Sequence, residues 1–291
     1  MIWWGINRNM VARSKLLEEI HAKSLLDVIP QIEELILEHG ELTLYDEGVY
    51  ICEHGQNVTH YLMPISHPLK LTKPKDEQSS EQFLGYTERY SSLGLKELLQ
   101  HTQITFNAKT EAKTTVFKID KKLFLAHLKK FPKVEHYLKL LTSSAGARSF
   151  KNFLEEFQIS QEIMIDIFFR IDDRQTSLQP GDVFENQNDY MYLISSGEVQ
   201  TQSLPGSDSP QKINLGEGAF FGGEALVPPY ESSYHIVATR PTRCLKLDLK
   251  FGRPLFEKHG LAEALFDEPW IQKQKPYGTG KIEGTLSSLP G

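Results

Sequence analysis

The sequence predicts an α+β fold with two β-rich domains, each flanked by helices. Three observations predict it. The chain has 291 residues, whereas one domain ordinarily holds about 100–200. Hydrophobic residues switch between helical spacing and strand alternation, and the switch occurs twice along the chain. An ordered set of landmarks also recurs at an offset of about 130 residues, which is the length of one ordinary domain.

The first half begins with apolar residues at helical spacing from Leu16 to Ile36, so we predict N-terminal helices over residues 1–41. From Leu42 the apolar residues alternate with polar ones, as in a half-buried strand. Strand patterns and then helical spacing continue to Leu141. We therefore predict a first β-rich domain over residues 42–141.

The second half repeats this order. Phenylalanines and isoleucines at helical spacing between Phe150 and Phe168 predict a connecting helix over residues 142–171. Strand patterns and a final helix from Arg253 to Phe266 follow, and they predict a second domain over residues 172–266. Residues 267–291 are polar and rich in glycine and proline, which is typical of a flexible tail or linker.

Composition excludes several classes of protein. Hydrophobic residues make up 40% of the chain and charged residues 24%, which suits a globular protein with a real core. The formal net charge of −6 argues against nucleic-acid binding. With only two cysteines, a cytoplasmic location is expected. No run approaches the ~18 apolar residues that direct membrane insertion requires.

The internal repeat has specific landmarks. Their order is the same in both halves, which a coincidence would not preserve. The pairs are Gly48 with Gly181, Tyr61 with Tyr192, Ser92-Leu93-Gly94 with Phe220-Phe221-Gly222, Ala108 with Ala238, and Phe117-Lys118-Ile119-Asp120 with Leu245-Lys246-Leu247-Asp248.

The second copy resembles cyclic-nucleotide-binding domains. The segments that carry the resemblance are 181–184, 192–199, a cassette-like run at 216–226, and 238–248. The resemblance covers about residues 160–266 and extends more weakly, through the repeat, to about 30–141. It implies two jelly-roll-like β-barrels of the cyclic-nucleotide-binding type, each flanked by helices.

The resemblance also implies a candidate ligand site. The family's cassette holds a cyclic phosphate with backbone N–H groups at a helix N-terminus, an arginine and a glutamate that binds the ribose. The matching positions in the second copy, which are the candidate ligand-binding residues, are Phe221, Gly222, Gly223, Glu224, Ala225, Ser232 and Ser233.

Both cassettes depart from the family pattern. In the second copy, Gly223 stands at the glutamate place, Glu224 comes one residue late, and Ser232 stands at the arginine place. A lost charge-assisted hydrogen bond costs about 1.5–3 kcal/mol. In the first copy, Leu95 and Thr102 stand at the glutamate and arginine places. We therefore expect no nucleotide binding in the first copy.

These departures favour a non-catalytic regulatory or interaction module that acts on a protein partner or a fused effector. We expect no catalytic residues, metal site or cofactor, since the closest histidines (His54, His60 and His67) suit surface turns better than a metal centre.

Three alternatives remain. One is a sensor that binds a cyclic nucleotide or another small ligand in the second barrel. Another is an enzyme with an unrecognised site in a barrel cavity. The third is a transcription factor, which would need a basic recognition helix after the second barrel, where the sequence offers only the tail.

Overall fold

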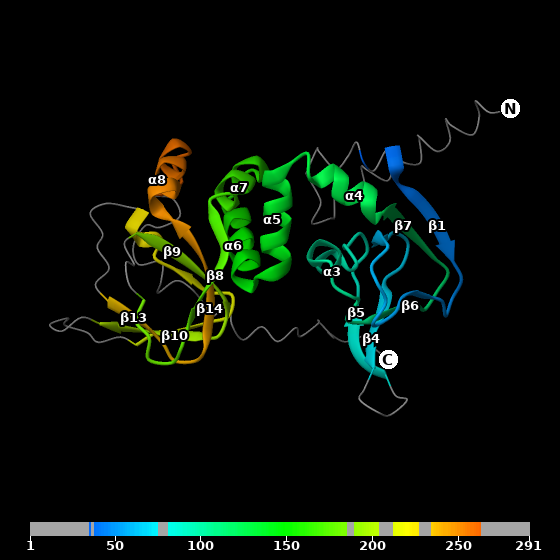
Figure 1. Cartoon of the computed structure of the whole chain (residues 1–291), viewed down its shortest axis with the longest axis horizontal. Coiled ribbons are helices and arrows are strands. Elements are labelled where there is room, and N and C mark those ends of the chain that lie inside the picture. Colours follow the sequence, from blue (N-terminus) through cyan, green and yellow to red (C-terminus); the bar gives the residue numbers. More distant parts are fainter. Residues whose placement is uncertain are drawn as a thin grey trace, which may run out of the picture. The chain divides into compact units, whose positions relative to one another are not determined.

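The computed structural model describes Leu35 and residues 38–74, 81–184, 189–203, 212–226 and 234–262, with backbone alone at 202, 203, 224, 225 and 234. The chain forms two compact units, residues 1–135 and 136–291. Figure 1 shows the sheets and helices of each unit. The predicted N-terminal helices, apart from Leu35 and residues 38–41, and the predicted tail lie outside the described residues.

The first unit contains two antiparallel sheets. The three-stranded sheet has the order β1 (Glu41–Tyr45), β7 (Thr114–Asp120) and β3 (His60–Pro64). The four-stranded sheet has the order β2 (Tyr50–Cys52), β6 (Asn107–Thr110), β4 (Leu69–Pro74) and β5 (Glu81–Tyr86).

The second unit also contains two antiparallel sheets. The four-stranded sheet has the order β12 (Phe220–Phe221), β9 (Tyr190–Ser196), β14 (Thr242–Asp248) and β8 (Ile171–Leu178). The three-stranded sheet has the order β11 (Asn214–Gly216), β10 (Glu198–Ser203) and β13 (Tyr234–Ala238).

The strands pair in the same order in both units. In the first unit Leu93 bridges to Leu62 of β3, and in the second Phe221 pairs with Tyr192 of β9. The order Leu93-β3-β7-β1 therefore matches β12-β9-β14-β8. In the other sheet of the second unit, Val183 bridges to β13, just as β2 pairs with β6 in the first unit. The order β2-β6-β4-β5 therefore matches Val183-β13-β10-β11.

These sheets do not close into the predicted barrels within the described residues. In the first unit β1 pairs with β7 only, whereas β2 pairs with β6 only. The chain passes between the two sheets at a turn where Gly48 has a φ of 81°, a conformation that glycine adopts without strain. The hydrogen-bond ladder breaks there, which leaves two open sheets instead of one closed cylinder.

Helices complete both units, as Figure 1 shows. The first unit has α3 (Leu95–Gln100) and α4 (Lys121–Leu128). Helix α5 (Pro132–Ser143) contains the boundary between the two units, which falls after residue 135. The second unit has α6 (Ala145–Glu156), α7 (Gln161–Phe168), the 3₁₀ turn η1 (Gly223–Leu226) and α8 (Leu249–Lys258).

The structure divides the segment predicted as one connecting helix. The end of α5 and then α6 and α7 occupy it. The division falls at two serine N-caps. The side chain of Ser144 accepts a hydrogen bond from the Ala147 N–H, and that of Ser160 from the Ile163 N–H. Such caps accept hydrogen bonds from N–H groups at the N-terminus of a helix, and they therefore favour the start of a separate helix at each serine.

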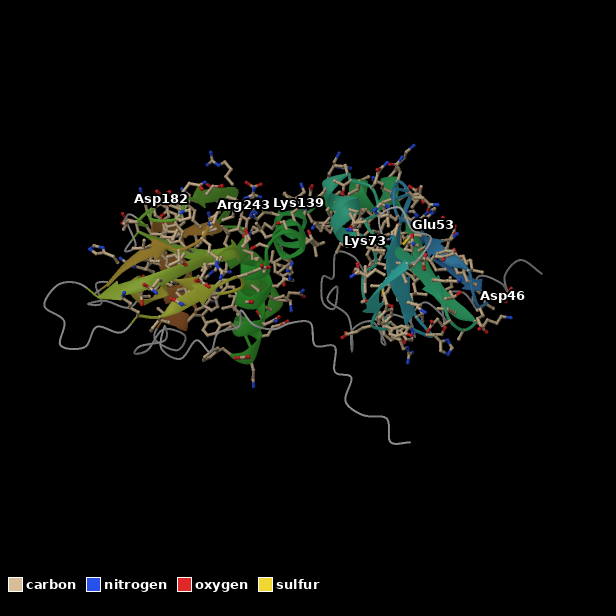
Figure 2. The ribbon with its side chains drawn as sticks, turned by 90° about the horizontal axis from the view of Figure 1, so that it is seen from below. Asp46, Glu53, Lys73, Lys139, Asp182 and Arg243 are labelled. Atoms are coloured by element: carbon tan, nitrogen blue, oxygen red, sulfur yellow. The ribbon has the colours of Figure 1, made fainter. Side chains whose placement is uncertain are left out.

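Charged residues cover the outside of both units. Figure 2 shows the side chains, with Asp46 and Glu53 labelled on the first unit and Asp182 and Arg243 on the second, and all four are exposed. Apolar residues fill the interior: in the first unit, Tyr61 stacks on Phe124 with 4.8 Å between ring centroids. The first predicted strand departs from this pattern, because Leu42 and Leu44 of β1 are 46% and 57% exposed.

Candidate functional site

The candidate cassette of the second unit, residues 216–226, contains the short strand β12. Its two residues, Phe220 and Phe221, are both buried. Successive side chains of a strand point to opposite faces. Phe221 therefore points between the two sheets, while Phe220 points toward the helices.

The inner face of the cassette packs against aromatic rings. Phe221 stacks on Tyr192 at 5.2 Å, and Phe184 meets both rings edge-on at 4.9 Å. Phe184 follows Val183, which bridges to the three-stranded sheet, so the cluster joins the two sheets. All three residues are at most 6% exposed. Aromatic side chains thus fill the interior beside the cassette.

The outer face of the cassette packs against helix α6. The Phe220 ring lies 5.2 Å from that of Phe150 and 5.1 Å from that of Phe153. Phe150 in turn lies 5.8 Å from Phe168 of α7, whose ring meets Tyr137 of α5 at 5.0 Å. A continuous row of aromatic contacts therefore runs from β12 through α6 and α7 to α5.

Glycine is required directly after β12. Gly222 has a φ of 88°, and a Cβ added there would lie 2.4 Å from the Tyr190 carbonyl oxygen. Only glycine accommodates both this conformation and this close approach. Gly222 therefore lets the chain turn from β12 into η1 directly against β9.

The structure describes part of the predicted ligand site. Phe221, Gly222 and Gly223 are buried and consecutive at the start of η1. Glu224 and Ala225 are described by their backbone alone, within η1. Ser232 and Ser233 lie outside the described residues.

The hydrogen bonds revise the residue pairing between the units. In the second unit, Gly181 N–H donates to the Ala238 carbonyl, and in the first, Gly48 N–H donates to that of Thr110. Thr110 rather than Ala108 is therefore the counterpart of Ala238. The arginine position of the family pattern lies six residues before this counterpart. In the first unit that position is therefore Ile104 rather than Thr102.

The strand pairing revises a second landmark in the same way. His60 pairs with Asp120, and Tyr190 pairs with Asp248. Asp120 and Asp248 each cap the helix that follows. The counterpart of Tyr61 is consequently Met191 rather than Tyr192. An offset of one is decisive in a strand because it moves a side chain to the other face.

An apolar side chain occupies the start of α3, the first unit's counterpart of η1. Ile104 is 3% exposed, and a Cβ added to Gly94 would lie 3.2 Å from its Cδ1 atom. Within α3 the buried Glu97 accepts a hydrogen bond from the Thr105 hydroxyl. An anion placed here would meet an isoleucine and a carboxylate, which disfavours phosphate binding.

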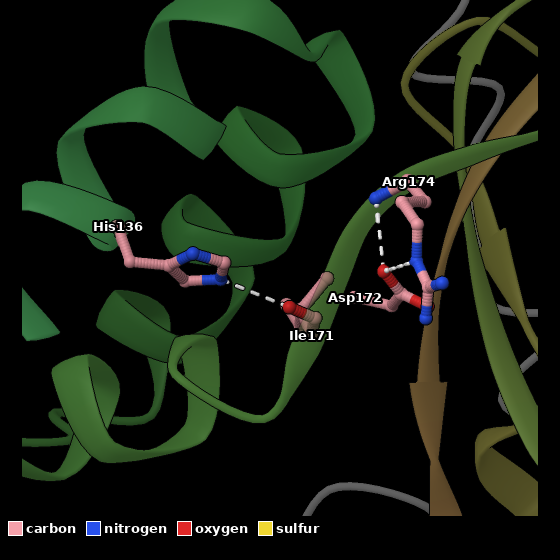
Figure 3. Close-up of polar contacts among 4 residues, drawn as sticks. All are labelled: His136, Ile171, Asp172 and Arg174. Atoms are coloured by element: carbon pink, nitrogen blue, oxygen red, sulfur yellow. Dashed lines mark hydrogen bonds and ion pairs between the residues drawn. The ribbon is translucent and has the colours of Figure 1, made fainter.

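Helix α5 is tied to the sheet of the second unit by His136. Its Nε2 atom donates to the Ile171 carbonyl at 2.9 Å, where β8 begins (Figure 3). The next residue, Asp172, accepts from the Arg174 backbone N–H and guanidinium. His136 therefore links α5 to the start of β8, and the Asp172–Arg174 pair is a local contact within that strand.

A surface groove of about 590 Å³ lies between β9 and α8, a feature that the sequence patterns do not predict. Both signs of charge line it, so it favours no single class of ion. The lining residues are Asp189, Tyr190, Asp248, Leu249, Lys250, Arg253, Pro254 and Glu257.

Other chemistry is limited in the part of the chain that the structure describes. No group of three or more metal-binding side chains occurs there. Both cysteines are buried, and burial raises the pKa of each thiol to about 12, so the thiols stay protonated. None of the described helices is long and apolar enough to cross a membrane.

Comparison with known proteins places one family on the second unit. Residues 175–259 match the cyclic nucleotide-binding domain family. No curated protein matches the chain. The matched region contains the candidate cassette and the strands around it.

Three solved structures are similar to the chain. The regulatory domain of Toxoplasma gondii PKA with cAMP is 14% identical, covering 90% of this chain and 97% of its own, with a TM-score of 0.40. The regulatory subunit of a cAMP-independent protein kinase A from Trypanosoma brucei is 12% identical, covering 90% and 95%, with a TM-score of 0.39. The sensor domain of the regulator DNR from Pseudomonas aeruginosa is 17% identical, covering 52% and 97%, with a TM-score of 0.40.

Proposed function

We propose that the chain is a non-catalytic regulatory module built from two degenerate, jelly-roll-like cyclic-nucleotide-binding domains. The family match over residues 175–259 supports this for the second unit. The common order of strand pairing supports it for the first unit.

The packing of Phe220 is the observation that supports a regulatory role, because it connects β12 to the helices. Phe220 and Phe221 are adjacent, yet one contacts the helices and the other lines the interior of the sheets. A shift of β12 would therefore move contacts on both faces together, because a close-packed interior transmits displacement. The row of rings from Phe220 to Tyr137 gives such a shift a physical route to α5.

Two features support a module that works without a cyclic nucleotide. In the second unit, three aromatic rings fill the interior beside the cassette, and serine stands at the arginine place. In the first unit, Ile104 covers the start of α3. A partner that contacts the outside of a unit requires none of the missing groups.

The second candidate is a sensor that binds a cyclic nucleotide or another small ligand at the second cassette. The family match favours it. The proposed ligand residues are Phe221, Gly222, Gly223, Glu224, Ala225, Ser232 and Ser233. In this version the ligand displaces β12, and Phe220 passes the displacement to α6.

A calorimetric titration of the full chain with cyclic AMP and cyclic GMP separates the two candidates. Up to about 1 mM nucleotide, the leading proposal predicts no binding heat. Saturable binding at lower concentration would replace it with the sensor. A thermal-shift screen provides an independent readout, because a ligand at about 100-fold its dissociation constant stabilises the folded state by about 2.7 kcal/mol.

A further inference from the structure

Strand β5 forms one edge of the four-stranded sheet in the first unit (Figure 1). It pairs with β4 and, among the described residues, with no other strand. Three of its large apolar side chains are about half exposed: Phe83 at 52%, Leu84 at 48% and Tyr86 at 53%. The outer side of an edge strand presents backbone N–H and C=O groups that lack a strand partner. This edge therefore combines unpaired backbone groups with exposed apolar side chains.

The fold does not require such an edge, as the second unit demonstrates. The equivalent strand is β11, which has three residues where β5 has six. Tyr86 of β5 pairs with Lys70, whereas Asn214 of β11 pairs with Gln200, so a polar residue stands at the aromatic position. Proteins commonly protect sheet edges by making them short and polar. The edge at β11 has both properties, and the edge at β5 has neither.

A β-bulge places Leu84 at the edge. Leu71 of β4 pairs with Gly85, and Thr72 pairs with Phe83, so Leu84 is the extra residue between them. The extra residue of a bulge has no partner on the neighbouring strand. A substitution of Leu84 therefore leaves the paired positions of β4 and β5 unchanged.

The aromatic rings of β5 are held by neighbours on one face of the sheet. The Tyr86 hydroxyl donates to the Glu111 carboxylate at 2.8 Å, and the same carboxylate lies 3.0 Å from the Lys70 ammonium group. The Lys70 nitrogen lies 6.0 Å from the centroid of the Phe83 ring, which meets the Tyr86 ring edge-on at 5.3 Å. Side chains that are already fixed lose little conformational entropy when a partner covers them.

The charges on that face balance one another. Lys70 and Lys109 are cross-strand neighbours on β4 and β6. Glu111 pairs with Lys70, and Glu81 accepts a hydrogen bond from Asn107 of β6. Two copies of a chain with a formal net charge of −6 repel each other. Two carboxylates and two ammonium groups make the surface beside β5 locally neutral, so a second copy meets little repulsion there.

We propose that β5 is a dimerisation edge, at which β5 of a second copy of this chain pairs antiparallel about a two-fold axis between Phe83 and Leu84. In this register Phe83 lies opposite Leu84 of the second copy, and Glu81 lies opposite Tyr86. Apolar side chains therefore meet each other and no like charges face one another. The contact is self-complementary, as a two-fold interface requires. It goes beyond the proposed regulatory function and does not depend on the cassette.

Two other kinds of occupant fit this edge less well. A nucleic acid would bring its phosphates against Glu81 and Glu111. A membrane interface accepts a wide apolar face, whereas charged groups lie between the aromatic rings of this one. A strand from a different protein would use the same backbone groups, and the oligomeric state of the isolated chain distinguishes it from a second copy.

Analytical ultracentrifugation of the full chain, from about 1 to 300 μM, tests the proposal. The wild-type chain should form dimers within this range. Leu84→Lys brings two positive charges together across the two-fold axis and should raise the dimer dissociation constant about tenfold or more. The matched control is Leu44→Lys, because Leu44 is 57% exposed on β1, an edge strand of the other sheet. It should change the constant less than about twofold, and circular dichroism checks that both variants fold.

Amide hydrogen exchange locates the contact. Exchange in β5 should be slower at about 300 μM than at about 1 μM, because dimerisation gives the outer N–H groups a partner, whereas exchange in β11 should not depend on concentration. In Leu84→Lys, β5 should exchange quickly at both concentrations. This readout separates pairing at β5 from a dimer formed elsewhere on the chain.

Three results would overturn the proposal. A chain that stays monomeric at about 300 μM would reject a second copy as the occupant. Equal weakening by Leu44→Lys and Leu84→Lys would reject β5 as the place. A dimer in which β5 exchange is the same at both concentrations would reject strand pairing. None of these measurements involves Phe220, so failure of the dimer and failure of the proposed function are distinguishable.

Discussion

The ring of Phe220 meets that of Phe150 edge-on, at 5.2 Å and an interplanar angle of 63°. This contact joins the cassette strand β12 to helix α6. Aromatic pairs in this geometry add about 0.5–1.5 kcal/mol to the free energy of burial. The contact consequently stabilises the second unit and also links the position of the cassette to that of the helices.

Truncating Phe220 should destabilise the chain strongly. Phe220→Ala removes a buried ring and leaves a cavity between β12 and α6, which costs about 3–5 kcal/mol. The matched control is Phe251→Ala, because Phe251 is 54% exposed in the same unit and should cost less than about 0.5 kcal/mol. Urea unfolding followed by circular dichroism measures both. Equal costs would show that the ring of Phe220 is not packed as described.

Gly222→Ala should be poorly tolerated. The new Cβ would collide with the Tyr190 carbonyl oxygen, and the positive φ is itself unfavourable, so the expected cost exceeds about 2 kcal/mol. Gly216→Ala is the control, because a Cβ there meets nothing within 4 Å. Thermal melting should separate the two variants clearly. A Gly222→Ala protein as stable as the control would contradict the close approach to β9.

Ser232→Arg should raise the affinity for cyclic AMP, if the family's phosphate contact is what the second cassette lacks. One charge-assisted hydrogen bond of about 1.5–3 kcal/mol corresponds to about one to two decades in dissociation constant. Ser233→Arg carries the same charge one residue later and should give a smaller gain. Calorimetry measures both. An equal response in the two variants would indicate non-specific attraction.

Acid should weaken the first unit through Glu81. Hydrogen bonds from Thr72, Tyr50 and Asn107 hold the pKa of the Glu81 carboxyl below its ordinary value of 4.5. A depressed pKa stabilises the folded state above the ordinary value, and this contribution is lost as the pH falls through the folded pKa.

The variant Glu81→Gln tests this pH dependence. Its unfolding free energy should fall less steeply than that of the wild-type chain as the pH drops below about 4.5. Glu53→Gln, at an exposed position of the same unit, should follow the wild-type curve. If the unfolding free energy of all three proteins depends on pH in the same way, Glu81 does not contribute to the acid sensitivity.

The sequence predicts much of the framework and less of the residue detail. Alternation from Leu42 and the helical spacing of the phenylalanines from Phe150 to Phe168 indicate where strands and helices occur. The helix start at Ser160 is not predicted, because the apolar spacing continues across that serine cap. One predicted helix consequently becomes several.

The candidate site was harder to predict than the fold. Counting back from Ala108 assigns the arginine place to Thr102, but hydrogen bonds move it to Ile104. Loops of different length change the number of residues between equivalent positions, and only the hydrogen-bonded pairing of the strands identifies those positions. The opposite directions of Phe220 and Phe221 follow from strand geometry, yet which side faces the helices depends on packing between segments distant in sequence.

Amide hydrogen exchange in Phe220→Leu, compared with Phe251→Leu, tests the coupling most directly. Phe220→Leu should speed exchange in α6 and α7, because it weakens the contacts that hold those helices on β12, while Phe251→Leu should leave both helices unchanged. Exchange in the first unit serves as an internal reference and should be the same in both variants. If Phe220→Leu changes exchange in β12 but not in α6 or α7, the cassette is not coupled to the helices and the regulatory account is wrong.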